Sequence, residues 1–93
     1  MYETRRSQIA RAILEYLYRH PDAQDTVAGI VQWWLPEAKI KARTAIVKEA
    51  LTELVGEGLV LERKAKDFQI HYRINLQSRK RIQWMLEGQP EDS

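Results

Sequence analysis

The sequence predicts a mainly α-helical domain with one small β-hairpin, and three observations support this fold class. Apolar residues recur at helical spacing in three successive segments, residues 5–19, 26–35 and 41–55. Residues 68–75 then alternate apolar and polar side chains, which is typical of a β-strand with one buried face. A last apolar stripe within residues 77–87 predicts a helix after the hairpin.

Length and composition are those of a single folded domain. The chain has 93 residues, of which 44% are hydrophobic and 30% charged, enough for a thin core. We assign residues 1–88 to this domain and expect residues 89–93 to be frayed. The absence of cysteine excludes disulfides and thiolate metal sites. Because the chain has neither a membrane-spanning run nor a signal-peptide core, we expect a cytoplasmic protein.

Boundary residues define the first two helices. Thr4 is a suitable N-cap for the first helix, and the proline that follows His20 ends it. Asp25 or Thr26 caps the second helix. Its apolar stripe places Trp34 in the core, whereas the neighbouring Trp33 falls outside that stripe.

The third helix, residues 41–55, is followed at once by a hairpin. Two glycines, at positions 56 and 58, end the helix and turn the chain into residues 59–75. The second strand directs one set of side chains to the core: Phe68, Ile70, Tyr72 and Ile74. Asn75 is a suitable cap for the last helix.

A long helix running into a hairpin resembles the winged helix-turn-helix domains of bacterial regulators. The resemblance covers about residues 5–75 and lies in the spacing V-x-x-A-L-x-x-L-x-x-x-G-L-V, which is matched by Val47, Ala50, Leu51, Leu54, Gly58, Leu59 and Val60. It implies three helices, a two-stranded wing and a C-terminal helix. It also implies sequence-specific binding of double-stranded DNA in transcription regulation, with the N-terminal half of the third helix in the major groove.

The distribution of charge supports this implication more than the net charge of +2 does. Segment 39–48 carries four cations and no acid. Cations at a helix N-terminus are unfavourable unless that end meets an anion such as a phosphate. We interpret the apolar–cationic alternation of "KIKAR" as incidental to the helix entrance. The resemblance assigns this region to DNA contact through Lys39, Lys41, Arg43, Thr44, Ala45 and Lys48.

The predicted hairpin tip, residues 63–67, forms a second cationic group. Arg63, Lys64 and Lys66 are placed where a wing would meet backbone phosphate or a minor groove. The alternative is a solvated turn in which lysines protect exposed strand edges. Both interpretations are consistent with the sequence.

Apolar residues outside the main helical stripes predict a homodimer. Two helices, the first and the last, carry such residues, and we assign the interface to Leu14, Tyr18, Trp84 and Met85. The alternative is that Trp84 folds back over the first helix within one monomer.

The sequence contains no pattern typical of catalysis. His20 and His71 lie far apart without a third metal ligand, and there is no phosphate-binding glycine loop or nucleophile–histidine grouping. We therefore expect neither an enzyme nor a bound cofactor. The alternative to DNA binding is a protein–protein interaction module within a larger complex, which the modest net charge and the off-stripe Trp33 and Trp84 favour.

Overall fold

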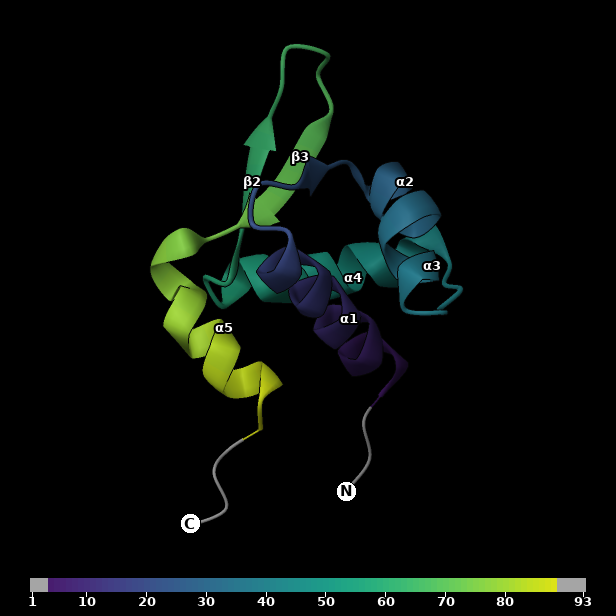
Figure 1. Ribbon diagram of the computed structural model, residues 1–93. Helices are drawn as coiled ribbons and strands as arrows, with labels where there is room; N and C mark the ends of the chain where they lie inside the picture. The colour runs from purple at the N-terminus through teal and green to yellow at the C-terminus, as the bar shows by residue number, and fades with distance from the viewer. Residues whose placement is uncertain (1–3, 89–93) are drawn as a thin grey trace.

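The structure, a computed structural model that describes residues 4–88, is a body of helices from which a β-hairpin projects (Figure 1). The elements in chain order are α1 (Arg5–Arg19), β1 (Gln24–Asp25), α2 (Val27–Gly29), η1 (Ile30–Trp34), α3 (Leu35–Glu37), α4 (Thr44–Gly56), β2 (Val60–Lys64), β3 (Ile70–Ile74), η2 (Leu76–Ser78) and α5 (Arg79–Leu86). The predicted class, mainly helical with a small antiparallel sheet, is confirmed. The expected frayed tail, residues 89–93, lies outside the described part of the chain.

Helix α1 has the predicted bounds because its two ends are encoded locally. The Ser7 N–H donates to the Thr4 Oγ1 at 3.0 Å, so Thr4 is the N-cap. The helix ends at Arg19, immediately before the His20-Pro21 pair. Its core face consists of Ile9, Ile13 and Leu17, all fully buried.

The second helical stretch is continuous but contains a wider turn. Thr26 is its cap, since its Oγ1 accepts the Gly29 N–H at 3.2 Å. In η1 the Leu35 N–H reaches back five residues to the carbonyl of Ile30, which makes this turn π-helical. Pro36 has no N–H and its ring crowds the preceding turn, and the wider turn relieves that crowding. The stretch extends through Glu37, beyond the predicted end at residue 35.

Lys39 ends this stretch in a left-handed conformation, with φ 60°. Its N–H donates to the Pro36 carbonyl at 2.8 Å, and the Ile40 N–H donates to the Leu35 carbonyl at 3.0 Å. This is a Schellman motif, which satisfies the last carbonyls of a helix. Lys39 is therefore a helix-terminating residue, separated from α4 by a short linker.

The linker from residue 40 to 43 corrects two predictions. The third helix begins at Thr44, not at Lys41, because Arg43 is an extended N-cap residue with ψ 148°. The "KIKAR" alternation is also not incidental. Ile40 and Ala42 pack against the core, while Lys41 between them and Lys39 and Arg43 on either side are exposed, as in an extended segment over a hydrophobic surface.

The sheet contains a third strand that the sequence did not predict. β1 pairs with β3, matching Gln24 with Arg73, and the strand order is β1-β3-β2. Two residues are too few to display an alternating pattern. β1 covers part of the free edge of β3 and so joins the α1–α2 connection to the hairpin.

The hairpin departs from its predicted core face toward the tip. Ile74 is 2% exposed, but Ile70 is 42% exposed because the outer part of the hairpin extends beyond the helices (Figure 1). Phe68 is not in the strand at all. It lies in the loop that connects β2 and β3, with φ 64° and 81% of its surface exposed.

The core lies where α1, the second helical stretch, α4 and α5 meet the base of the hairpin. Trp34 is buried as predicted, and its ring stacks on that of Tyr16 at a centroid distance of 4.7 Å. Two arginine side chains join α5 to its neighbours by hydrogen bonds to carbonyls at helix C-termini. Arg81 donates to the Glu57 carbonyl at the end of α4, and Arg11 donates to the Leu86 carbonyl at the end of α5. Within residues 4–88, no helix combines the length and the apolar character needed to cross a bilayer.

Candidate nucleic-acid interface

The N-terminus of α4 presents unpaired hydrogen-bond donors to solvent. Arg43 is its N-cap residue but makes no side-chain cap, and the first turn carries no acid. The first backbone bond is from the Val47 N–H to the Arg43 carbonyl, at 3.2 Å. The N–H groups of the first turn and the positive end of the helix dipole are therefore free to bind an anion. Thr44 and Ala45, both exposed, leave short side chains at this end.

The side chains of the cations around this end have no partner among the described residues. Within residues 4–88, no side-chain hydrogen bond or ion pair involves Lys39, Lys41, Arg43 or Lys48. Several arginines of α1 and α5 behave differently. Arg5 donates to the Lys41 carbonyl, Arg6 pairs with Glu53 at 3.2 Å, and Arg79 lies over the Tyr18 ring at 5.3 Å. Arg19, Arg73 and Lys80 are also exposed and have no side-chain partner within residues 4–88, but they lie apart from one another on α1, β3 and α5, whereas the four cations at residues 39–48 are close in sequence.

The positive region of α4 ends after Lys48. Glu49 and Glu53 are exposed on the helix beyond Lys48, and Glu57 is exposed at its C-cap. Lys48 lines a shallow hollow with Thr52 and with the Arg6–Glu53 ion pair. Only the N-terminal half of α4 could therefore approach a polyanion without repulsion.

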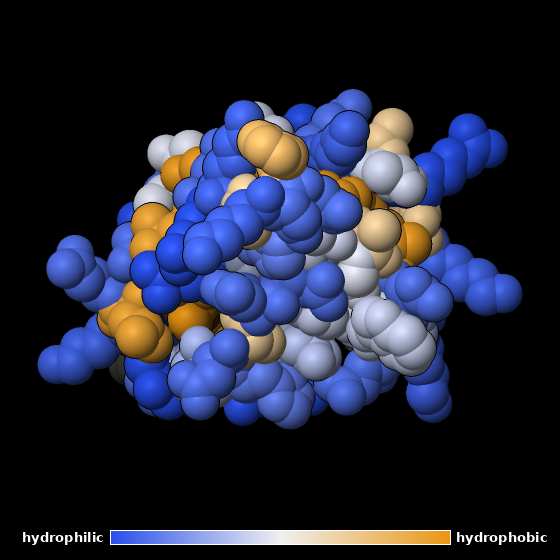
Figure 2. Space-filling view, turned by 90° about the horizontal axis from the view of Figure 1, so that it is seen from above, coloured by the Kyte–Doolittle hydropathy of each residue, from blue (hydrophilic) through white to orange (hydrophobic). Residues whose placement is uncertain are grey.

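The hairpin carries a second, separate group of cations. Arg63, Lys64 and Lys66 are exposed, and hydrophilic side chains dominate the face from which the hairpin projects (Figure 2). Lys64 Nζ lies 5.7 Å from the centroid of the Phe68 ring. Among the described residues, no hydrogen bond or ion pair joins the hairpin loop to the start of α4. The two cationic groups therefore lie on independent elements.

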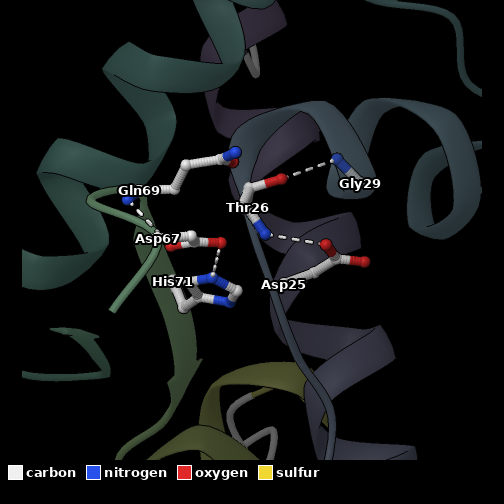
Figure 3. A network of polar contacts seen from close by, with 6 residues as sticks. All are labelled: Asp25, Thr26, Gly29, Asp67, Gln69 and His71. Carbon is white, nitrogen blue, oxygen red and sulfur yellow. Dashed lines mark hydrogen bonds and ion pairs between the residues drawn. The ribbon is translucent and has the colours of Figure 1, made fainter. Parts of the chain in front are cut away.

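Asp67, the only acid between residues 63 and 69, is directed away from the tip. Figure 3 shows its carboxylate beside His71, on the side of the hairpin near the start of α2. It accepts the Gln69 N–H at 2.9 Å and lies 3.6 Å from His71 Nε2. The Gln69 N–H, and secondarily His71, lower the pKa of the Asp67 carboxyl. The carboxylate is thus stabilised as an anion in this position.

The predicted dimer residues fall into two groups. Leu14 is 3% exposed within one chain, where it lies among residues of α1, α4 and α5, and so offers little surface to a second copy. Met85 and Tyr18 are partly buried against the core of the same chain. Trp84 is 50% exposed and is the one member of the set with a large free apolar surface.

The histidines are well separated and do not form a metal site. His20 lies 3.8 Å from Glu37, and His71 lies beside Asp67. No cluster of three or more potential metal ligands occurs in the part of the chain that the structure describes.

Comparison of the chain with family models, with curated proteins and with solved structures finds no match.

Proposed function

We propose that this chain is a winged-helix protein that binds double-stranded DNA sequence-specifically, as a small transcriptional regulator. The order of its elements supports the proposal: a helix, a short strand, a second helical stretch, a longer helix and a hairpin. The observation that carries it is the concentration of unengaged cations at the open N-terminus of α4 and on the hairpin.

Each residue has a defined role in this proposal. Thr44 and Ala45 face the base edges in the major groove, where the alanine methyl can contact a thymine methyl. Lys41, Arg43 and Lys48 bind the flanking phosphates, with Lys39 at the margin. Arg63, Lys64 and Lys66 bind phosphates beside the neighbouring minor groove, so that the hairpin acts as a wing.

Charge reversal at the α4 entrance tests the assignment. We expect Lys41→Glu with Arg43→Glu to weaken binding to a fluorescent duplex at least about tenfold at low salt. The matched control is Arg19→Glu with Arg73→Glu, which changes the net charge equally at two exposed cations outside the proposed DNA contacts and outside α5, and should retain most of the affinity. Equal losses in the two variants would show that only net charge matters.

Sequence specificity requires a separate measurement. Repeated selection of bound molecules from a randomised duplex library should enrich one motif, because Thr44 and Ala45 contact base edges in this proposal. If the wild-type protein binds duplexes but enriches no sequence, the proposal of a specific regulator is wrong.

We also infer that two copies pair through α5, placing two α4 helices on successive half-sites. The exposed Trp84 ring supports this pairing.

A second candidate function is protein–protein interaction within a larger complex. Trp33 is 65% exposed and Trp84 50% exposed, and such aromatic surfaces are common at interfaces. A wild-type protein that binds no duplex at low salt would favour this candidate over DNA binding.

A further inference from the structure

Phe68 has a left-handed backbone conformation, which bulky residues seldom adopt. The Phe68 N–H donates to the Ala65 carbonyl at 3.0 Å, and the Ala65 N–H donates to the Gln69 carbonyl at 2.9 Å. These bonds place Phe68 in a left-handed conformation, with φ 64°. Hairpin loops usually place glycine or asparagine at such a position. Backbone strain in a bulky residue is uncommon and concentrates at functional sites.

The Phe68 ring gains no compensating burial in the folded chain. It is 81% exposed, more than any other large hydrophobic side chain among residues 4–88. Among the described residues, the one cation near the ring is the Lys64 ammonium group, 5.7 Å from the ring centroid. The strained backbone therefore holds a large, solvent-exposed ring in the loop that connects β2 and β3.

The surroundings of the ring are positively charged. Arg63 and Lys66 are exposed and, within the described chain, make no ion pair or side-chain hydrogen bond. The Asp67 carboxylate contacts His71 and the Gln69 N–H, and no ion pair joins it to a lysine or arginine within residues 4–88 (Figure 3). A polyanion with flat apolar surfaces between its charges is complementary to this arrangement, and stacked bases between phosphates have that chemistry.

We propose that Phe68 is a base-stack wedge, which inserts between neighbouring base pairs from the minor groove while Arg63, Lys64 and Lys66 hold the flanking phosphates. This inference rests on the proposed function, because it requires that the hairpin meets duplex DNA. Insertion is easiest at flexible or already unstacked steps, so the wedge adds selectivity for deformable DNA to the contacts of α4.

The test compares two fluorescent duplexes that differ only in a central T·T mismatch, since a mismatch lowers the cost of unstacking. We expect the wild-type chain to bind the mismatched duplex about tenfold more tightly than the matched one. Phe68→Ala should abolish this preference, and Phe68→Trp should retain it. Ile70→Ala is the matched control, because it removes exposed apolar surface from the hairpin without removing a ring.

A second readout reports on the bases directly. 2-Aminopurine placed beside the mismatch should brighten when the wild-type chain binds and stay dim with Phe68→Ala at a saturating concentration. Phe68→Gly, which suits the left-handed backbone, guards against misfolding and should behave as Phe68→Ala does.

The outcomes separate this inference from the proposed function. If the wild-type chain and Phe68→Ala bind both duplexes equally, with salt-dependent affinity, the wedge is wrong and DNA binding stands. If the wild-type chain binds neither duplex at low salt, the proposed function fails and the wedge with it. Phe68-dependent binding to anionic lipid vesicles without an effect on DNA would also overturn the wedge.

Discussion

At the residue scale, the left-handed backbone of Phe68 leads to a prediction about stability that does not depend on DNA binding. A left-handed conformation costs a residue with a Cβ atom roughly 1–2 kcal/mol, whereas glycine adopts it freely. Phe68→Ala and Phe68→Gly both remove the ring, but only glycine relieves the strain. We expect Phe68→Gly to exceed Phe68→Ala in free energy of unfolding by about 1 kcal/mol in urea titrations. An alanine variant as stable as the glycine variant would show that the loop relaxes.

A second prediction at this scale concerns Asn75, whose side chain joins the end of β3 to the turn after α4 and to η2. Its Nδ2 donates to the Gly58 carbonyl at 2.8 Å and its Oδ1 accepts the Gln77 N–H at 3.1 Å. Asn75→Ala removes both bonds and should lower the free energy of unfolding by about 1–2 kcal/mol in thermal or urea unfolding. Gln77→Ala is the control, since its exposed side chain makes no hydrogen bond within residues 4–88. Equal stabilities of the two variants would contradict this role.

At the element scale, the sequence predicted those boundaries that are encoded by local capping. Thr4 caps α1, and Gly58 adopts φ 77° after α4 as the glycine pattern predicted. Asn75, which we expected to cap the last helix, caps the 3-10 turn η2 that precedes α5. The missed boundaries depend on context. β1 has only two residues, and its pairing is determined by the position of β3. The start of α4 was missed because residues 41–43 are compatible with a helix, and the Schellman motif at Lys39 gives no glycine signal.

The candidate interface, like the element boundaries, was predicted only in part from the sequence. The cationic segments were visible in the sequence, but their freedom from ion pairs required the structure. Phe68 was wrongly placed in the strand because the alternation of apolar and polar residues in β3 continues into the loop that precedes it. One signal was available: the loop contains no glycine or asparagine, so another residue had to adopt the left-handed position.

For Lys41 and Arg43, immediately before α4, we predict that the same substitutions change stability and DNA binding in opposite directions. Glutamate in place of Lys41 and Arg43 would oppose the positive end of the helix dipole and favour the helix. We expect this double variant to gain up to about 1 kcal/mol in free energy of unfolding at low ionic strength while it loses affinity for DNA. Thermal melting in low and high salt checks this expectation. Destabilisation at both salt concentrations would show that the two cations support the fold.

At the scale of the whole molecule, pairing of two chains depends on α5. We expect analytical ultracentrifugation at high micromolar concentration to detect a dimer. Trp84→Ala should shift it to monomer, because removal of the ring eliminates the main exposed apolar surface of this helix. Trp33→Ala, at another exposed tryptophan, should leave the dimer intact. A wild-type chain that sediments only as a monomer would contradict the pairing.

The central claim is that the start of α4 and the hairpin bind duplex DNA through their free cations. Six of these are assigned to phosphates: Lys41, Arg43, Lys48, Arg63, Lys64 and Lys66. The most direct test is the affinity for duplex DNA as a function of salt concentration, measured by fluorescence anisotropy. Release of counterions from about six phosphates predicts a log–log slope of roughly −5 per bound chain. A slope near zero, or no binding at low salt, would contradict the claim.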